Sequence, residues 1–110
     1  MKVLHLTLSK KPFEVMVTGE KTDEFRGDSM WIGSRLYHSE ARFGQKRHYD
    51  LVKFVNGYGD DKPYFIAEYR GFDRAIETTR FEYSNGLVVV VLRGEYIIHL
   101  GKIIETGNLK

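Results

Sequence analysis

The sequence contains no cysteine, and its four histidines show no metal-ligand spacing. The missing thiols exclude disulfide bonds, zinc sites built on thiolates and catalysis by a cysteine nucleophile. We therefore expect no metal site and no cofactor. The sequence also has no phosphate-binding loop, dinucleotide fingerprint or nucleophile elbow, so none of these motifs points to an enzyme class.

Long hydrophobic runs and a strong net charge are also absent. The longest purely apolar run, residues 87–92, is too short to span a bilayer, and the first residues lack the apolar segment of a signal peptide. These features predict a cytoplasmic protein with no membrane partner. A net charge of +2 means that any contact with nucleic acid must rest on a local patch. The 110 residues favour one domain, residues 1–110.

What the sequence does contain is a series of short segments with strand or helix periodicity. Apolar residues at helical spacing predict two short helices, and alternating or wholly apolar stretches predict strands. Residues 73–83 show no clear period and are compatible with a helical turn, whereas residues 87–92 read as a strand buried on both faces. The pattern favours an α+β fold, mainly β: a small β-barrel of about five to six strands with two short helices at its edge. The predicted helices are 9–18 and 30–36, and the predicted strands are 2–8, 21–26, 49–55, 64–72, 87–92 and 95–104.

The predicted strand at residues 21–26 carries an unusual set of polar side chains. If residues 21–26 form a strand, Thr22, Glu24 and Arg26 share one face, and Phe25 points to the other face as the expected core anchor. Lys21 lies at the preceding turn, so the alternation does not fix its direction. A hydroxyl, a carboxylate and a guanidinium aligned on one strand face indicate a candidate binding site.

The spacing of Gly19, Lys21, Glu24 and Arg26 (G-x-K-x-x-E-x-R) resembles the motif of the ASCH domain family, whose fold is related to the PUA RNA-binding domain. The Y-D-x-V-x-F-x-N-G-Y pattern at residues 49–58 and the ending at residues 96–104 also resemble ASCH domains. The resemblance covers nearly the whole chain and implies a PUA-like barrel. It further implies a cleft lined by Lys21, Glu24 and Arg26, with Gly19 shaping its approach, that binds RNA or a nucleotide.

Four further residues complete the predicted ligand-binding set. Trp31 and Arg35 fall close together on the second predicted helix, either as a base-stacking platform beside a phosphate contact or as a core residue and a solvated one. Lys53 stands on an otherwise apolar strand face, where it either reaches out to solvent or faces the cleft. Tyr58 closes the pattern at residues 49–58.

The segment from residue 37 to residue 48 is basic. It holds His38, Arg42, Lys46, Arg47 and His48 against a single acid, with aromatic residues interleaved. Such a segment either follows a phosphate backbone or is simply solvated.

Two classes of function fit the motif. One is a module that binds RNA or a nucleotide. The alternative is a small hydrolase of RNA or nucleosides, in which Lys21 and Glu24 would be the catalytic residues. In the acetylcytidine amidohydrolases that the family includes, a threonine nucleophile stands three residues after the lysine, where this chain has Glu24 and instead carries Thr22. A third interpretation is that the motif is a salt-bridge cluster fixing the helix–strand junction of an interaction domain.

Overall fold

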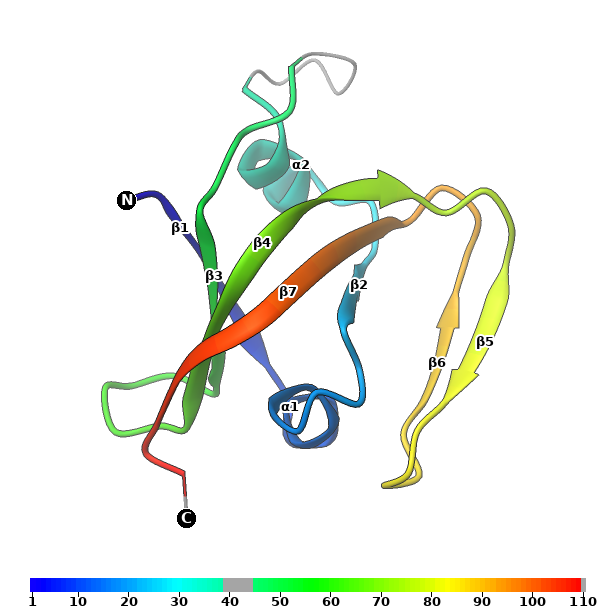
Figure 1. The fold of residues 1–110 in the computed structure, drawn as a ribbon. Coiled ribbons are helices and arrows are strands. Elements are labelled where there is room, and N and C mark those ends of the chain that lie inside the picture. Colours follow the sequence, from blue (N-terminus) through cyan, green and yellow to red (C-terminus); the bar gives the residue numbers. More distant parts are fainter. Residues whose placement is uncertain (39–44, 110) are drawn as a thin grey trace.

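The computed structural model describes residues 1–38 and 45–109, and within them it contains seven strands and two helices (Figure 1). The predicted class, an α+β fold made mainly of strands, is confirmed. In chain order the elements are Val3–Leu8 (β1), Lys10–Val17 (α1), Asp23–Arg26 (β2), Met30–Leu36 (α2), Leu51–Asn56 (β3), Tyr64–Arg74 (β4), Thr79–Glu82 (β5), Val88–Val91 (β6) and Tyr96–Gly107 (β7).

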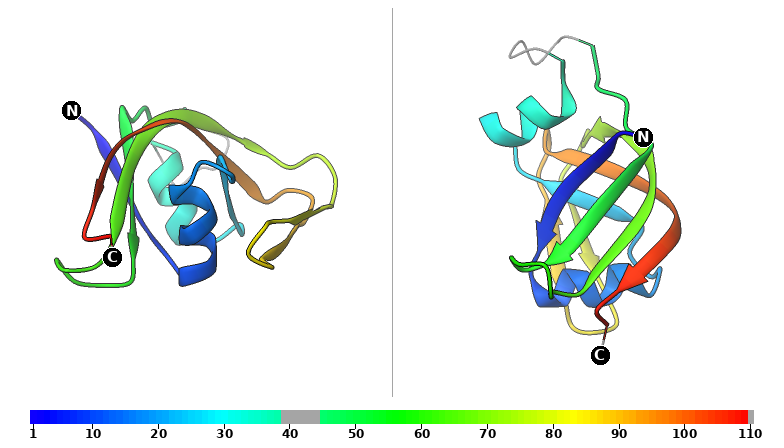
Figure 2. Two further views of the ribbon diagram at one scale, coloured as in Figure 1. Left: turned by 60° about the horizontal axis from the view of Figure 1, so that its bottom comes forward. Right: turned by 90° about the vertical axis from the view of Figure 1, so that its left-hand side faces the viewer.

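Five strands form one sheet in the order β1-β3-β4-β7-β2, in which β1 pairs parallel with β3 and the other neighbours are antiparallel. The sheet curls into a half-barrel whose two edges are β1 and β2 (Figures 1 and 2). Strands β5 and β6 form a separate hairpin that stands beside β2. The open side of the half-barrel therefore lies between the two edge strands.

The hydrophobic core fills the concave side of this sheet. The sheet arches over α1 and α2, which contribute the buried side chains of Phe13, Met16, Ile32 and Leu36 (Figure 2). Aromatic rings from the sheet meet them, and the rings of Phe13 and Phe65 lie 5.5 Å apart between centroids. The other core residues are Leu4, Leu6, Leu8, Tyr37, Val52, Phe54, Ala67, Phe72, Tyr96 and Ile98.

The long strands β4 and β7 bend across the sheet through irregularities in their pairing. The register shifts three times between Ile66 and Phe72, and Gly71 adopts the left-handed conformation, with φ of 90°. At the same place the Glu68 carboxylate accepts a hydrogen bond from the backbone N–H of Lys102, at 2.8 Å. A Cβ at Gly101 would lie 2.6 Å from that carboxylate, so glycine makes room for this contact.

The region from residue 73 to residue 92 differs from the sequence prediction. Residues 73–83 hold no helical turn, because β4 continues to Arg74 and β5 follows at Thr79–Glu82. Residues 87–92 are not buried on both faces, since Val90 is 51% exposed while Val91 is buried. The physical reason is that β6 pairs with β5 in a two-stranded hairpin, which has only one face turned toward the rest of the molecule.

His99 links three strands on the outer face of the sheet. Its Nδ1 lies 2.9 Å from Asp23 of β2, and its Nε2 lies 2.8 Å from Asp73 of β4. Burial favours the neutral ring, but the hydrogen bonds to the two carboxylates outweigh it and raise the pKa of His99 above 6.5. A raised folded-state pKa stabilises the fold below the unfolded-state pKa, and this stabilisation is lost as the pH rises through the folded-state pKa.

We therefore expect His99→Gln to destabilise the protein more at pH 6 than at pH 8.5. Because the ring is partly exposed and solvent screens the pairs, the difference should be a few tenths to about 1 kcal/mol. Urea unfolding at both pH values measures it, with the exposed His5→Gln as the matched control. Equal losses at the two pH values would contradict the role given to His99.

Candidate functional site

The motif residues reach one place because of the turn that follows α1. Gly19 adopts the left-handed conformation, with φ of 86°, and its N–H bonds the carbonyl of Met16. The chain then folds back, and the N–H of Lys21 donates to the carbonyl of Val15 at 2.9 Å. The turn buries the Lys21 side chain against α1 at the start of β2.

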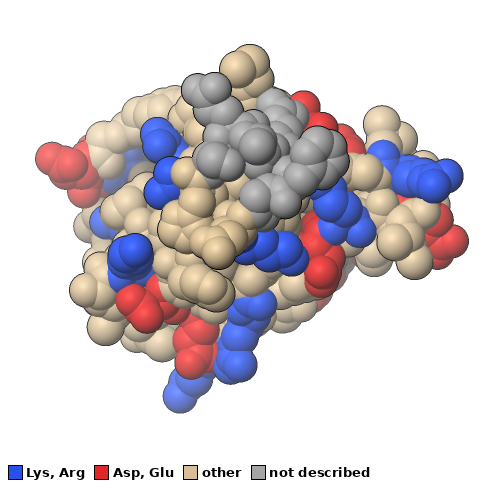
Figure 3. Space-filling view, turned by 90° about the horizontal axis from the view of Figure 1, so that it is seen from above, with Lys and Arg blue, Asp and Glu red and all other residues tan. Residues whose placement is uncertain are grey.

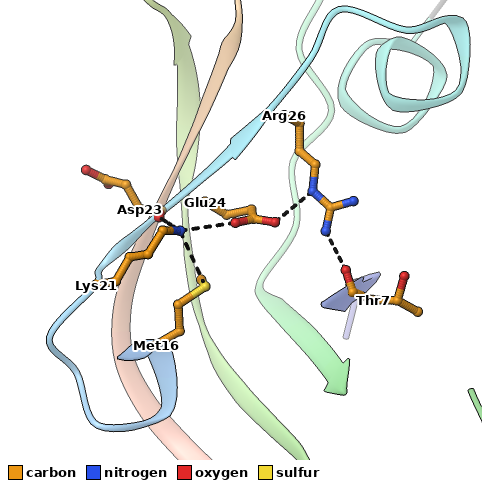
Figure 4. A network of polar contacts seen from close by, with 6 residues as sticks. All are labelled: Thr7, Met16, Lys21, Asp23, Glu24 and Arg26. Atoms are coloured by element: carbon orange, nitrogen blue, oxygen red, sulfur yellow. Dashed lines mark hydrogen bonds and ion pairs between the residues drawn. The ribbon is translucent and has the colours of Figure 1, made fainter. Parts of the chain in front are cut away.

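The ammonium group of Lys21 is surrounded by acceptors (Figure 4). Its Nζ lies 3.1 Å from Glu24 Oε1 and 3.6 Å from the sulfur of Met16, and it also donates to the backbone carbonyl of Asp23. Lys21 is only 3% exposed. Burial lowers the pKa of Lys21, and the nearby Glu24 carboxylate opposes that shift. Because an ammonium has three donors, these contacts leave none for a ligand.

Glu24 joins the two cations of the motif. Its Oε1 pairs with Lys21, and its Oε2 accepts from Nε of Arg26 at 2.7 Å. The side chain is 7% exposed, so this is a carboxylate buried with charge on both sides. Its neighbour Phe25 is not a core anchor: it is half-buried and stacks on Phe81 of the hairpin, with centroids 5.1 Å apart. The inward face of β2 carries Glu24 in place of an apolar residue.

Arg26 closes the open side of the half-barrel. Its Nη2 donates to the backbone carbonyl of Thr7 at 2.6 Å, so the guanidinium joins edge strand β2 to edge strand β1 (Figure 4). Its side chain remains 24% exposed. Within the part of the chain that the structure describes, Nη1 of Arg26 makes no hydrogen bond or ion pair. This nitrogen is a donor that the described contacts of the motif leave available.

A hollow of about 290 Å³ lies over the motif. Such a volume is at the lower end for small-molecule sites and suits a nucleoside or a single nucleotide. The hollow is formed by the end of β1, the start of α1, β2 and the hairpin strand β6. Two cations and one carboxylate leave its charged lining with one net positive charge. The lining residues are Thr7, Leu8, Ser9, Pro12, Lys21, Glu24, Phe25, Arg26 and Val89.

Three of the other predicted site residues lie next to this hollow. Arg26, Trp31 and Tyr58 line a second hollow of about 410 Å³, and Trp31 and Arg35 line a third of about 400 Å³. Trp31 is 49% exposed and therefore not a core residue, and the guanidinium carbon of Arg35 lies 5.1 Å from its ring. Lys53 is not brought to this group. It lies on the outer face of β3, where its Nζ sits 4.4 Å above the ring of Tyr64.

The basic segment at residues 37–48 is described only in part, because Arg42 and the other residues from 39 to 44 lie outside the described residues. Lys46 donates to the carbonyl of Phe72 at 2.7 Å, and Arg47 donates to that of Tyr37 at 2.8 Å. Seen from this end of the molecule, basic and acidic groups are interspersed (Figure 3). Lys46 thus contacts strand β4, and Arg47 contacts Tyr37 at the end of α2, while contact of this segment with a phosphate backbone stays a prediction.

Sequence reasoning missed two parts of the site. One is the backbone carbonyl of Thr7, which carries no sequence signal because every residue has one. The other is Val89, which reaches the hollow only because the hairpin packs beside β2. Thr22, by contrast, is exposed and does not line the hollow. Among the described residues, no three histidine or acidic side chains cluster to hold a metal ion, and no helix is long and apolar enough to cross a membrane.

The buried network leads to a prediction about stability. Glu24→Gln leaves the Lys21 charge uncompensated and should cost about 3–5 kcal/mol, whereas Lys21→Met should cost less because Glu24 keeps Arg26. The double variant should lose less free energy of unfolding than the two single variants together, by more than about 1 kcal/mol. The cost of Glu24→Gln should shrink as the pH rises toward 10.5, because folded Lys21 releases its proton before unfolded lysine does.

Urea unfolding of the four proteins measures these values. The exposed pair Arg80–Glu82 on the hairpin provides the control, and its Arg80→Met and Glu82→Gln cycle should couple by less than about 1 kcal/mol. Additive effects at Lys21 and Glu24 would show that the two side chains do not stabilise each other.

Comparison with known proteins assigns no family to this chain. No family model, no curated protein and no solved structure matches it. The resemblance to ASCH domains therefore rests on the motif residues and remains a prediction, and the function must be argued from the geometry of the site.

Proposed function

We propose that the protein binds RNA or a nucleotide in the hollow over the motif, with Arg26 contacting the phosphate. The observation that carries this proposal is the state of the Arg26 guanidinium. Glu24 and the carbonyl of Thr7 hold it in place on two sides, at 2.7 and 2.6 Å, while Nη1 is left to donate. A guanidinium that is already fixed loses little further freedom when it binds an anion. The resemblance of the motif to ASCH domains supports the same proposal.

Lys21 and Glu24 act in this proposal as positioning residues. Lys21 neutralises Glu24 from the side away from Arg26, so the buried carboxylate can hold the guanidinium without repelling a phosphate. The three side chains together keep one positive charge, which a phosphate complements. Their contacts thus orient one cation, the guanidinium of Arg26, in the lining of a small hollow.

The same contacts favour binding over hydrolysis. A general base must be free to accept a proton, but both oxygens of Glu24 already accept from cations. A nucleophilic hydroxyl must face the substrate, but Thr22 lies outside the lining of the hollow. Lys21 likewise has no donor left for an oxyanion. These three observations support a binding module rather than a hydrolase.

Binding should depend on Arg26. Replacing it in Arg26→Gln should weaken the binding of uridine monophosphate and of short RNA by about 10- to 100-fold, because a hydrogen bond to a charged group contributes about 1.5–3 kcal/mol. For RNA, the logarithm of affinity should fall linearly with the logarithm of salt concentration, with a slope magnitude of about 0.7 for each phosphate that the protein contacts.

Calorimetric titration at low and moderate salt measures both effects. Arg80→Gln removes the same charge from the exposed face of the hairpin and serves as the control. Circular dichroism and thermal melting of Arg26→Gln separate loss of the ligand contact from loss of the link to Thr7. Unchanged affinity in a folded Arg26→Gln, or no binding of any nucleotide at low salt, would refute the proposal.

The purified protein should not hydrolyse acetylated cytidine or cleave RNA. Chromatography of the nucleoside and gel analysis of an RNA oligomer after long incubation test this, and any trace activity should survive Thr22→Val. Robust turnover that Thr22→Val abolishes would identify a threonine-dependent amidohydrolase. Robust turnover that only Glu24→Gln abolishes would instead identify a hydrolase that activates water.

A further inference from the structure

The three hollows described above form one groove along the free edge of β1. The first and second share Thr7 and Arg26, and the second and third share His5 and Trp31. The groove therefore runs from the motif, past Tyr58 and Trp31, to Arg35 and Tyr49. β1 has six residues at ~3.3 Å each, so the groove is about 20 Å long. This is longer than a mononucleotide requires.

Around the second and third hollows, the ionisable lining residues are basic or aromatic, and the rest are aliphatic except for Trp31 and Thr7. The residues around the second and third hollows include Arg26, Arg35 and His5 but no aspartate or glutamate. This is notable in a chain with 15 acidic residues and a net charge of only +2. The exposed rings of Trp31 and Tyr58 belong to the same lining, and the half-buried ring of Tyr49 lies at its far end. Guanidinium groups beside exposed aromatic rings are the combination that binds single-stranded nucleic acid, because the cations meet phosphates and bases stack on the rings.

Trp31 is built to take a stacked base. Half of its surface is open, although Ile32 and Leu36 of the same helix pack into the core. Arg35 lies one turn further along α2, with its guanidinium 5.1 Å from the indole. The backbone carbonyl of Arg35 accepts a hydrogen bond from the hydroxyl of Tyr49 at 2.5 Å, which ties this end of the helix to the residues before β3. The ring is thus held beside a cation in a fixed position.

The edge of β1 adds backbone groups to the groove. Strand β1 pairs in the sheet with β3 alone, so its other edge has no neighbouring strand among the described residues. The carbonyl of Thr7 points to that open side, where Arg26 reaches it. Backbone groups alternate along a strand, so the N–H and carbonyl of His5 point to the same side. They are placed to bond the edges of unpaired bases.

We propose that this groove binds a single-stranded RNA segment of up to about six nucleotides, anchored at Arg26 and stacked on Trp31. The upper limit is the groove length divided by ~3.4 Å per stacked nucleotide. The inference rests on the proposed function, which it extends from one nucleotide to a strand. A peptide strand added to β1 is disfavoured, because Arg26 already occupies the carbonyl of Thr7 and the groove is lined by cations.

Trp31 is the single tryptophan of the chain, so its fluorescence reports directly on the groove. Titration with oligouridylates of one to ten nucleotides should show affinity that rises with length up to about six and then levels off. The hexamer should quench the fluorescence, and the monophosphate should bind without quenching. Trp31→Ala should weaken the affinity for the hexamer by about 5- to 150-fold, as the loss of one stacked base predicts. The affinity for the monophosphate should change by less than about twofold.

The controls separate this inference from the proposed function. Met30→Ala truncates an exposed neighbour on the same helix and should change neither affinity, while Trp31→Phe should retain most of the hexamer binding. If the monophosphate binds but the hexamer binds no tighter and does not quench, the groove is overturned and the proposed function stands. Equal quenching by hexaglutamate would assign the groove to acidic peptides and overturn the RNA inference. Binding of neither nucleotide would overturn both.

Discussion

The ion network centred on Glu24 is the interaction on which the open side of this molecule depends. A closed barrel joins its first and last strands by a ladder of backbone hydrogen bonds. In this half-barrel, side chains replace that ladder: Lys21 neutralises Glu24, Glu24 orients Arg26, and Arg26 reaches the carbonyl of Thr7. Because Lys21 and Glu24 are buried, removing Glu24 leaves the charge of Lys21 without a partner, which costs more than the intact network gains. The same ion network therefore determines the geometry of the open side of the fold and of the candidate site.

This shared origin limits what the site can do chemically. A carboxylate that holds two cations is a poor base, and a lysine with three acceptors is a poor donor to a substrate. The network instead holds the guanidinium of Arg26 in place and, among the described residues, leaves its Nη1 without a hydrogen bond, beside the hollows described above. We propose that such an arrangement favours recognition of an anion over its chemical transformation. The interpretation of the motif as a structural cluster and its interpretation as a binding site are thus compatible in this protein.

Much of the fold could be predicted from the sequence because burial on one side leaves a visible alternation. Leu4, Leu6 and Leu8 mark β1 in this way, and all three are in the core. The grouping of Glu24 with Arg26 follows from the same period. Phe25 was misjudged because a large apolar residue usually marks the buried face, whereas here the buried face carries Glu24 with its two cations. In residues 87–92 every side chain is apolar, so the sequence has no period that could distinguish a one-sided hairpin from a core strand. The partner of Arg26 is a backbone carbonyl, and no side-chain pattern reveals it.

The pairing of β2 with β7 has a consequence for how the molecule is made. Asp23 pairs with His99, 76 residues later, so β2 has no place in the sheet until the last strand has been synthesised. Contacts between such distant residues close late, because the long loop between them must first lose its freedom. While the chain leaves the ribosome, the Lys21–Glu24 pair is therefore exposed to solvent and fully hydrated. The contacts that orient Arg26 therefore form only after β7 has paired with β2, so a chain without β7 has no oriented arginine to offer the proposed ligand.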